Sequence, residues 1–230
     1  MPESLSTATT PHASHEAGAH ARHFPVGTGE LERIAAAVLN AARRGGATAA
    51  ETEVSQGIGQ SVTVRQSQVE TIAYNRDKGI SVSVYVGQRR GHASTADFSA
   101  DSVQATVDKA LAIARYTAED PAAGLADPDR LAQSWPDLDL YHPWALPVES
   151  AIAMGRAAEA AALAVDKRIT NSEGATVARG ESEFVYANSN RFLGGYRSSR
   201  HHIDCAVISE QDGAMQRDYW YSSARSPHDL

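Results

Sequence analysis

The histidines near the N-terminus are the residues whose types and spacing come nearest to a metal site. His15, Glu16 and His20 form an HExxxH string. Zinc peptidases commonly use HExxH, in which two histidines share one helix face and the glutamate acts as base. Here the longer spacing turns the second histidine by about 140° on a regular helix. Gly18 lies inside the string and Pro11 precedes it, so chance composition explains the string better than a catalytic site does.

A second cluster of chemically capable side chains comprises His201, His202, Asp204 and Cys205. A cysteine beside a histidine can act as a nucleophile with its base. On a strand, however, His202 and Cys205 point to opposite faces because their positions differ by an odd number. Cys205 shares its face with Ile203 and Val207 and is interpreted as a small core residue. His201 and His202 are expected at a strand start or facing solvent.

The remaining motifs are weaker. The sequence contains no GxSxG elbow, no phosphate-binding GxxxxGK[ST] loop and no CxxC pair. Gly194-Gly195 is typical of a strand kink or bulge. Arg89-Arg90 is expected to be exposed, with a carboxylate clamp as the alternative, and Trp135 and Trp144 are expected to pin loops to a core. The sequence therefore identifies no catalytic residue and no metal ligand, and it leaves the substrate-binding residues unknown.

Alternating apolar and polar residues between positions 61 and 96 predict one long hairpin. Val62 and Val64 lead one strand, and the return strand follows a polar turn at residues 75–79. Strict alternation over this length is typical of an antiparallel sheet with one buried and one solvated face. The segment therefore specifies a scaffold.

Helices are predicted on both sides of this hairpin. The first has apolar residues at helical spacing from Leu31 to Ala42 and ends at Gly45-Gly46. Ser99 caps the second, whose buried stripe runs from Val103 to Ala114. Residues 119–147 are expected to lack a helix, because X-Pro pairs disfavour one.

An alanine-rich helix is predicted from Val148 to about Lys167. Alternating strands follow at 175–177, 183–186, 203–208 and 215–222, with turns at 188–190 and 211–213. This order predicts an α+β fold, with antiparallel β-sheets and packed helices. Helix and then hairpin occurs twice, so the chain could hold two similar units. Internal duplication and convergence on one kind of layer both explain that pattern.

The predicted organisation has a disordered tail (1–27), an N-terminal α+β domain (28–118), a linker (119–147) and a second α+β unit (148–230). The tail cannot bury enough apolar surface to offset its chain entropy. Ser226 and Pro227 resemble the start of a helix. We therefore expect the second unit to be truncated before a C-terminal domain.

Composition narrows the functional classes without naming one. The 230 residues are 42% hydrophobic and carry a formal charge of -7, which argues against nonspecific binding to nucleic acid or to anionic membranes. No run approaches the about 18 apolar residues of a membrane span, and the N-terminus lacks the apolar core of a signal peptide. Cys205 is the single cysteine, which fits a reducing cytoplasm.

Several stretches are similar to the TldD/PmbA family. The hairpin from Gly79 to Thr95, which contains YVGQRRGHAST, resembles the signature hairpin of that family, and the similarity continues through residues 99–127. Downstream, the stretches that resemble its PmbA/TldE-like branch are 171–175, 187–190 and 215–221. The resemblance covers residues 30–230 and identifies the chain as the N-terminal part of a family member.

The resemblance implies a cytoplasmic bacterial metallopeptidase system that degrades or trims unfolded peptides. In that family, TldD-like chains carry a zinc-binding HExxxH helix, and PmbA-like chains pair with them without an intact metal site. The metal helix of the family lies beyond the point that corresponds to Leu230. The string at His15 therefore cannot be equated with it, and no catalytic residue of the family maps onto this chain.

The resemblance thus implies the scaffold of a non-catalytic subunit in a heterodimer, with zinc expected in a TldD-like partner and no cofactor in this chain. Unfolded peptides are the expected substrates; nucleic acid and membrane are not expected partners. A free-standing peptide-binding or assembly module derived from the same family is the alternative. A third hypothesis is an independent enzyme that uses the N-terminal histidines.

Overall fold

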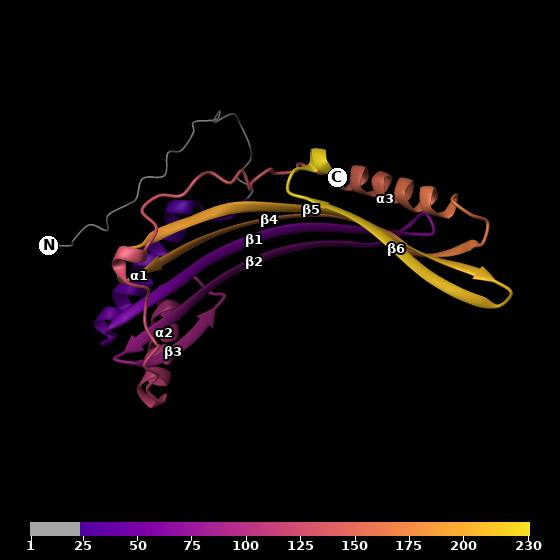
Figure 1. The fold of residues 1–230 in the computed structure, drawn as a ribbon. Helices are drawn as coiled ribbons and strands as arrows, with labels where there is room; N and C mark the ends of the chain where they lie inside the picture. Colours follow the sequence, from indigo (N-terminus) through magenta and orange to yellow (C-terminus); the bar gives the residue numbers. More distant parts are fainter. Residues whose placement is uncertain (1–23) are drawn as a thin grey trace. The chain divides into compact units, whose positions relative to one another are not determined.

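The computed structural model describes residues 24–230. Its helices are α1 (Thr28–Arg44), α2 (Ala100–Tyr116) and α3 (Val148–Leu163), with short 3-10 turns at Pro128–Arg130 and Pro227–Asp229. Its strands are β1 (Ala49–Arg65), β2 (Gln68–Val86), β3 (Arg89–Thr95), β4 (Ile169–Asn188), β5 (Leu193–Gln211) and β6 (Ala214–Ala224). They form one sheet in the order β3-β2-β1-β4-β5-β6 (Figure 1). The predicted α+β class is confirmed.

The chain divides into two compact units, each assembled from separate stretches of sequence. Unit 1 comprises the residues up to Gln56, Asp77–Asp137 and Glu183–Tyr196, and unit 2 comprises Gly57–Arg76, Leu138–Ser182 and Arg197–Leu230. The sequence-based division at 28–118, 119–147 and 148–230 follows the chain instead and stays a prediction. None of the helices in the described range 24–230 is both long enough and apolar enough to cross a membrane.

The predicted turn at residues 75–79 is wrong, because β2 continues straight through it. The chain reverses at Gln66 and Ser67, whose φ angles are 49° and 61°, and again at Gly87, whose φ angle is 60°. The side chains at 66–78 are exposed regardless of their alternation. Polar residues there reflect solvent contact, so they carry no information about a turn.

Unit 1 has its apolar core between α1, α2 and one face of the sheet. Ser99 caps α2 as predicted, since its hydroxyl accepts a hydrogen bond from the backbone N–H of Ser102. Gly91 of β3 lies so close to α2 that a Cβ at this position would come within 1.9 Å of the Ala110 carbonyl oxygen. The buried core residues include Leu31, Val38, Val54, Ile80, Val82, Val84, Val107, Leu111 and Val185.

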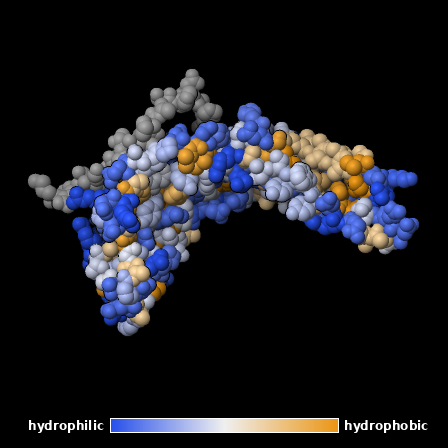
Figure 2. Space-filling view, in the orientation of Figure 1, coloured by the Kyte–Doolittle hydropathy of each residue, from blue (hydrophilic) through white to orange (hydrophobic). Residues whose placement is uncertain are grey.

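Unit 2 packs α3 against its part of the sheet. Its buried apolar residues are Val62, Val64, Leu146, Ala151 and Val177. Gly155 lets the helix approach closely, because a Cβ there would lie 3.2 Å from a Val64 methyl carbon. The surface of α3 is beige to orange in the space-filling view, in keeping with its many alanines (Figure 2).

Beside this apolar core, unit 2 buries an ion pair. Arg179 Nη1 lies 3.0 Å from Glu181 Oε1, and the Glu181 side chain is fully buried. Tyr141 donates to the other carboxylate oxygen of Glu181 over 2.7 Å, and Arg179 also donates to Gln60 Oε1 over 3.4 Å. β4 runs without a break through residues 178–182, so the predicted separate strands at 175–177 and 183–186 are one strand.

A second buried carboxylate holds the turn between β1 and β2. Glu159 of α3 accepts the backbone N–H of Gln66 on Oε1 and that of Ser67 on Oε2, both over 2.7 Å. Burial acts to raise the pKa of Glu159, but hydrogen bonds from Ser67, Ser172 and Gln66, with the nearby charge of Arg65, lower it overall. The carboxylate thus stays ionised and satisfies two turn N–H groups at once.

Candidate functional site

The histidines that were candidates for a metal or catalytic role lie in different surroundings. His15, Glu16 and His20 lie outside the described residues. His201 is fully buried, so the prediction of a strand start or a solvent-facing position is wrong for it. Its Nε2 lies 2.8 Å from the His142 carbonyl oxygen. Residues 140–146 cover this part of β5, and no local pattern around His201 indicates this.

His202 and Cys205 do not form a catalytic pair. His202 is partly exposed, and its Nε2 lies 2.9 Å from Asp204 Oδ1. Cys205 is only partly buried, and this burial, followed by the charges of Glu159 and Asp204, raises the pKa of its thiol. A thiol whose pKa is raised is a poor nucleophile.

The described side chains do not fit a zinc site. Between residues 24 and 230, no three His, Cys, Asp or Glu side chains converge closely enough to hold a metal ion. Zinc sites in proteins use three or four such ligands. The donors that could serve, His201 and His202, are already directed at a backbone carbonyl and at Asp204.

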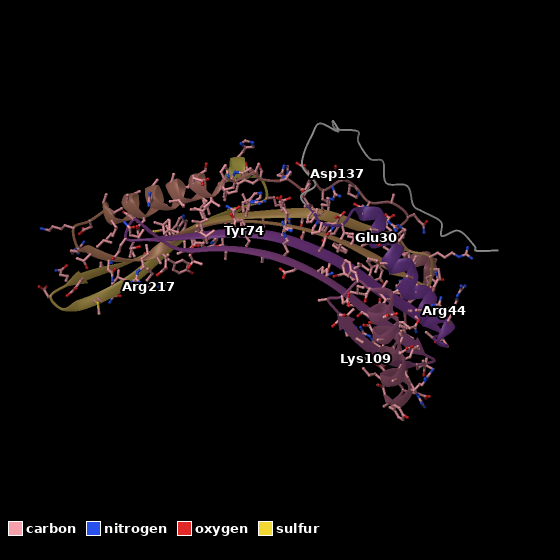
Figure 3. The ribbon with its side chains drawn as sticks, turned by 180° about the vertical axis from the view of Figure 1, so that it is seen from behind. Glu30, Arg44, Tyr74, Lys109, Asp137 and Arg217 are labelled. Atoms are coloured by element: carbon pink, nitrogen blue, oxygen red, sulfur yellow. The ribbon has the colours of Figure 1, made fainter. Side chains whose placement is uncertain are left out.

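A cavity of about 340 Å³ lies between α1 and α2 of unit 1. Ile34, Phe98 and Val103 contribute its apolar lining, and Glu30 and Arg44 (both labelled in Figure 3) line it as well. Glu30 already pairs with Arg33. This volume lies near the lower limit for small-molecule pockets, and we assign the cavity to imperfect packing of the two helices.

The most elaborate arrangement of polar side chains lies on the face of the unit 1 sheet opposite α1 and α2. Successive side chains of a strand alternate between the two faces, so the neighbours of core residues point to this second face. The face, here called the polar face, carries Glu51, Glu53, Ser83, Tyr85, Arg90, His92, Phe184 and Tyr186. It therefore collects side chains from β1, β2, β3 and β4.

Glu51 is the centre of the polar face. Its Oε1 accepts a hydrogen bond from the Tyr85 hydroxyl over 3.0 Å, and its Oε2 accepts one from the Tyr186 hydroxyl over 2.8 Å. Burial, then the interactions with Glu51, raise the pKa of Tyr85. Burial also raises the pKa of Tyr186, to about 12, and Glu51 adds to this effect. Both phenols therefore remain protonated and hold the carboxylate from two sides.

Arg90 of β3 lies near this carboxylate, and His92 of the same strand shares a partner with Arg90. Arg90 Nη2 donates to Ser83 Oγ over 2.9 Å and lies 4.0 Å from Glu51 Oε1. Ser83 Oγ is also 3.2 Å from His92 Nδ1. Of the two alternatives for the arginine pair, Arg89 forms a carboxylate clamp, because its Nη2 donates to Glu119 Oε1 over 3.2 Å. Arg90 is 54% exposed and lies near Glu51 without a hydrogen bond to it.

Aromatic rings continue the polar face across β4 and the start of β5. Phe184 and Tyr196 meet edge to face with centroids 4.6 Å apart. Phe192 lies 5.8 Å from the ring of Tyr186 and 5.8 Å from that of Trp135. Trp135 therefore pins its loop, as predicted. The rings give the polar face an apolar wall beside its carboxylate.

Close approach of β5 to β4 depends on Gly195. A Cβ at this position would lie 2.0 Å from the carbonyl oxygen of Phe184. The prediction of a kink or bulge at Gly194-Gly195 did not anticipate this reason for glycine.

Unit 2 presents two strand edges without a neighbouring strand among the described residues. β6 is the last strand of the sheet and pairs with β5 from Ala214 to Ala224. β3 pairs with β2 only from Ile80 onward, which leaves residues 68–76 of β2 uncovered on that side. Figure 3 labels Tyr74 on β2 and Arg217 on β6. Both edges are lined by exposed side chains.

The β6 edge is unusually apolar for a surface strand. Met215, Tyr219, Trp220 and Tyr221 are exposed by 68%, 56%, 83% and 55%. Arg217 lies in their midst, pairs with Glu173 over 2.7 Å and stacks on the Tyr219 ring at 5.4 Å. Natural edge strands are commonly protected by charge, proline or a bulge. The β6 edge is therefore a candidate surface for pairing with another chain.

Sequence reasoning missed Glu51, Tyr85 and Tyr186 as a group. They lie on three strands, and only the pairing of those strands brings them together. One signal was available in the sequence: each of the three alternates with core residues of its own strand, so each had to face away from the helices. Alternation alone does not tell which strands are neighbours.

Comparison with known proteins identifies the family. Residues 50–114 match the family model of the PmbA/TldA metallopeptidase domain 1, and residues 141–230 match that of the PmbA/TldA metallopeptidase central domain. Metalloprotease PmbA of Escherichia coli O157:H7 is 42% identical over 200 residues, which cover 87% of this chain and 44% of that protein. The PmbA homolog of Haemophilus influenzae is 39% identical over 196 residues, which cover 85% of this chain and 43% of that protein. The chain thus spans less than half the length of these relatives.

Solved structures agree with this assignment. A Bacteroides thetaiotaomicron protein, proposed to modulate DNA gyrase, superposes with a TM-score of 0.80 at 27% identity and covers 86% of this chain and 46% of its own. TldE from Thermococcus kodakarensis superposes with a TM-score of 0.62 at 11% identity, over 86% of this chain and 43% of its own, and this likeness shows the fold alone. The two matched domains, in this order, and the PmbA relatives together show that the chain belongs to the PmbA/TldD metallopeptidase family and corresponds to the N-terminal part of its members.

Proposed function

We propose that this chain is the scaffold part of a PmbA/TldE-like subunit in a cytoplasmic complex that degrades or processes peptides. In this proposal a TldD-like partner carries the zinc and breaks the peptide bond. The described residues of this chain contribute strand edges and surface to the complex. Family membership supports the proposal, as does the scattering of the possible metal donors over separate hydrogen-bond partners.

The β6 edge is the observation that carries the proposal. An extended peptide can add to a free sheet edge through backbone hydrogen bonds, which recognise peptides regardless of much of their sequence. Side chains beside the edge then supply apolar contact, and aromatic residues are those that most often dominate binding energy. Trp220 and its two tyrosine neighbours are exposed as that role requires.

The division of labour is tested by a peptide cleavage assay. This chain alone, supplied with zinc and an unfolded fluorogenic peptide, is expected to show no turnover above buffer. Addition of a TldD-like subunit should produce turnover. Cleavage by this chain alone that is lost in the His15→Ala variant would overturn the proposal, because it would place the active site in the N-terminal histidines.

The role of the β6 edge is tested by Trp220→Ser. We expect this variant to bind an extended peptide about tenfold more weakly, since loss of an aromatic interface anchor costs over 1 kcal/mol. Tyr116→Ser is the matched control, because Tyr116 is 92% exposed on α2. Fluorescence anisotropy of a labelled peptide measures both. Equal affinities for the two variants would remove β6 as the peptide edge.

A further inference from the structure

We propose that the polar face of unit 1 binds a guanidinium group, such as the side chain of an arginine in an extended peptide, with Glu51 as the anion. This goes beyond the proposed function, since it gives unit 1 a ligand of its own. The alternative is a purely structural role, in which Glu51 only connects β1, β2 and β4 through its two hydrogen bonds. The geometry around the carboxylate favours binding for three reasons.

The first reason is that the carboxylate is held in place by hydrogen bonds but keeps acceptor positions for further donors. Each carboxylate oxygen can accept two hydrogen bonds. Tyr85 and Tyr186 supply one to each oxygen of Glu51, which leaves a second acceptor position on both. The Glu51 side chain is 24% exposed, so a ligand can reach it. The two phenols therefore preorganise an anion that retains the capacity for a bidentate donor.

The second reason is that Arg90 lies next to Glu51 without occupying it. The separation of 4.0 Å between Arg90 Nη2 and Glu51 Oε1 exceeds hydrogen-bond length. The same Nη2 is instead directed at Ser83 Oγ, 2.9 Å away. The guanidinium of Arg90 is thus accommodated near the carboxylate. The position in which two parallel N–H groups would bind both oxygens of Glu51 is left to the guanidinium of a ligand.

The third reason is the character of the surroundings. Glu53 lies two positions along β1 on the same face and is exposed, so it adds negative potential. The rings of Phe184, Tyr186 and Tyr196 lie on this face beside the carboxylates. Guanidinium groups bind well where a carboxylate and aromatic faces occur together. Lysine would satisfy the charge but not the bidentate geometry.

The test uses Ac-Ala-Ala-Arg-Ala-Ala-NH2 and its citrulline analogue, which has nearly the same shape without the charge. Binding to the whole chain is measured by titration calorimetry at low and at high salt. We expect the arginine peptide to bind and the citrulline peptide to bind at least about tenfold more weakly, as expected for loss of a charged hydrogen bond. The affinity for the arginine peptide should fall as the salt concentration rises. Equal binding of the two peptides would overturn the proposal.

Variants separate ligand binding from a purely structural role. Glu51→Gln keeps the acceptor for a phenol and should abolish the preference for arginine over citrulline. Arg90→Gln should strengthen binding of the arginine peptide several-fold, because it removes the competing cation; a structural role predicts no such gain. Glu70→Gln is the control, on an exposed carboxylate of β2 in unit 2. An unchanged preference in Glu51→Gln, or no gain in Arg90→Gln, would each contradict the proposal.

The outcomes also distinguish this proposal from the role of β6. If Trp220→Ser weakens a peptide without basic residues and Glu51→Gln does not, β6 binds peptide and Glu51 is not needed for it. If Glu51→Gln removes the arginine preference while Trp220→Ser changes nothing, the polar face binds guanidinium and the β6 proposal fails. If Glu51→Gln unfolds by circular dichroism, the citrulline and Arg90→Gln results still decide.

Discussion

Replacement of Arg179 by methionine is expected to lower the free energy of unfolding of unit 2 by about 3 kcal/mol, because it removes a cation that lies 3.0 Å from a fully buried carboxylate. The Glu181 side chain is fully buried and that of Arg179 is only 18% exposed. Tyr141 donates to the same carboxylate over 2.7 Å, and the variant keeps this hydrogen bond. Urea unfolding, followed by tryptophan fluorescence, measures the change.

A second substitution tests the cause. The double variant Arg179→Met, Glu181→Gln should recover most of the lost stability, since it also removes the buried negative charge that Arg179 faces. Arg200→Met is the matched control, because Arg200 is exposed and its described partner is the Ser223 hydroxyl. If the single and double variants are equally destabilised, the loss comes from packing of the arginine stem and the electrostatic explanation is wrong.

Glu159→Ala is expected to be almost as damaging, at about 3 kcal/mol, because the N–H groups of Gln66 and Ser67 lose a charged, buried acceptor together. Gln66 and Ser67 both have positive φ angles, so the turn is held in a conformation that non-glycine residues seldom adopt. Hydrogen exchange at these two amides should accelerate strongly in the variant. Glu149→Ala, an exposed position in the first turn of the same helix, should leave both amides unchanged.

The pH dependence of stability follows from the same carboxylate. The pKa of Glu159 in the folded chain is lowered from its ordinary value of 4.5. Its stabilising contribution is therefore fully present above that value and is lost as pH falls through the lower, folded-state pKa. The difference in urea midpoint between the native chain and Glu159→Ala should shrink below pH 4.5. A constant difference down to strongly acid pH would show that the charge is not what matters.

The helices were predictable because local signals specify them. Ser99 as a cap, Gly45 at a C-terminus and the spacing of Leu31, Ile34 and Val38 need no knowledge of distant residues. The strands were located by alternation, but their lengths were not, because exposed residues such as those at 75–79 look like a turn. Strand continuity depends on the neighbouring strand, which the local sequence does not reveal.

The polar groups were the least predictable. Glu159 contacts amides more than ninety positions away, and Tyr141 reaches Glu181 from a segment read only as a linker. A single sequence shows that such residues are charged or polar; it does not show their partners. The same holds for His201, whose burial depends on residues 140–146 lying across β5.

The interleaving of the two units constrains how the chain can be made and cut. The core of unit 1 combines residues from distant parts of the chain, such as Leu31 of α1 and Val185 of β4. Its hydrophobic interior therefore stays incomplete during translation until residues 183–196 have left the ribosome, by which time most of unit 2 has also been synthesised. No single cleavage point in the polypeptide would separate the two units intact, because a cut at any position leaves pieces of at least one unit on both of its sides.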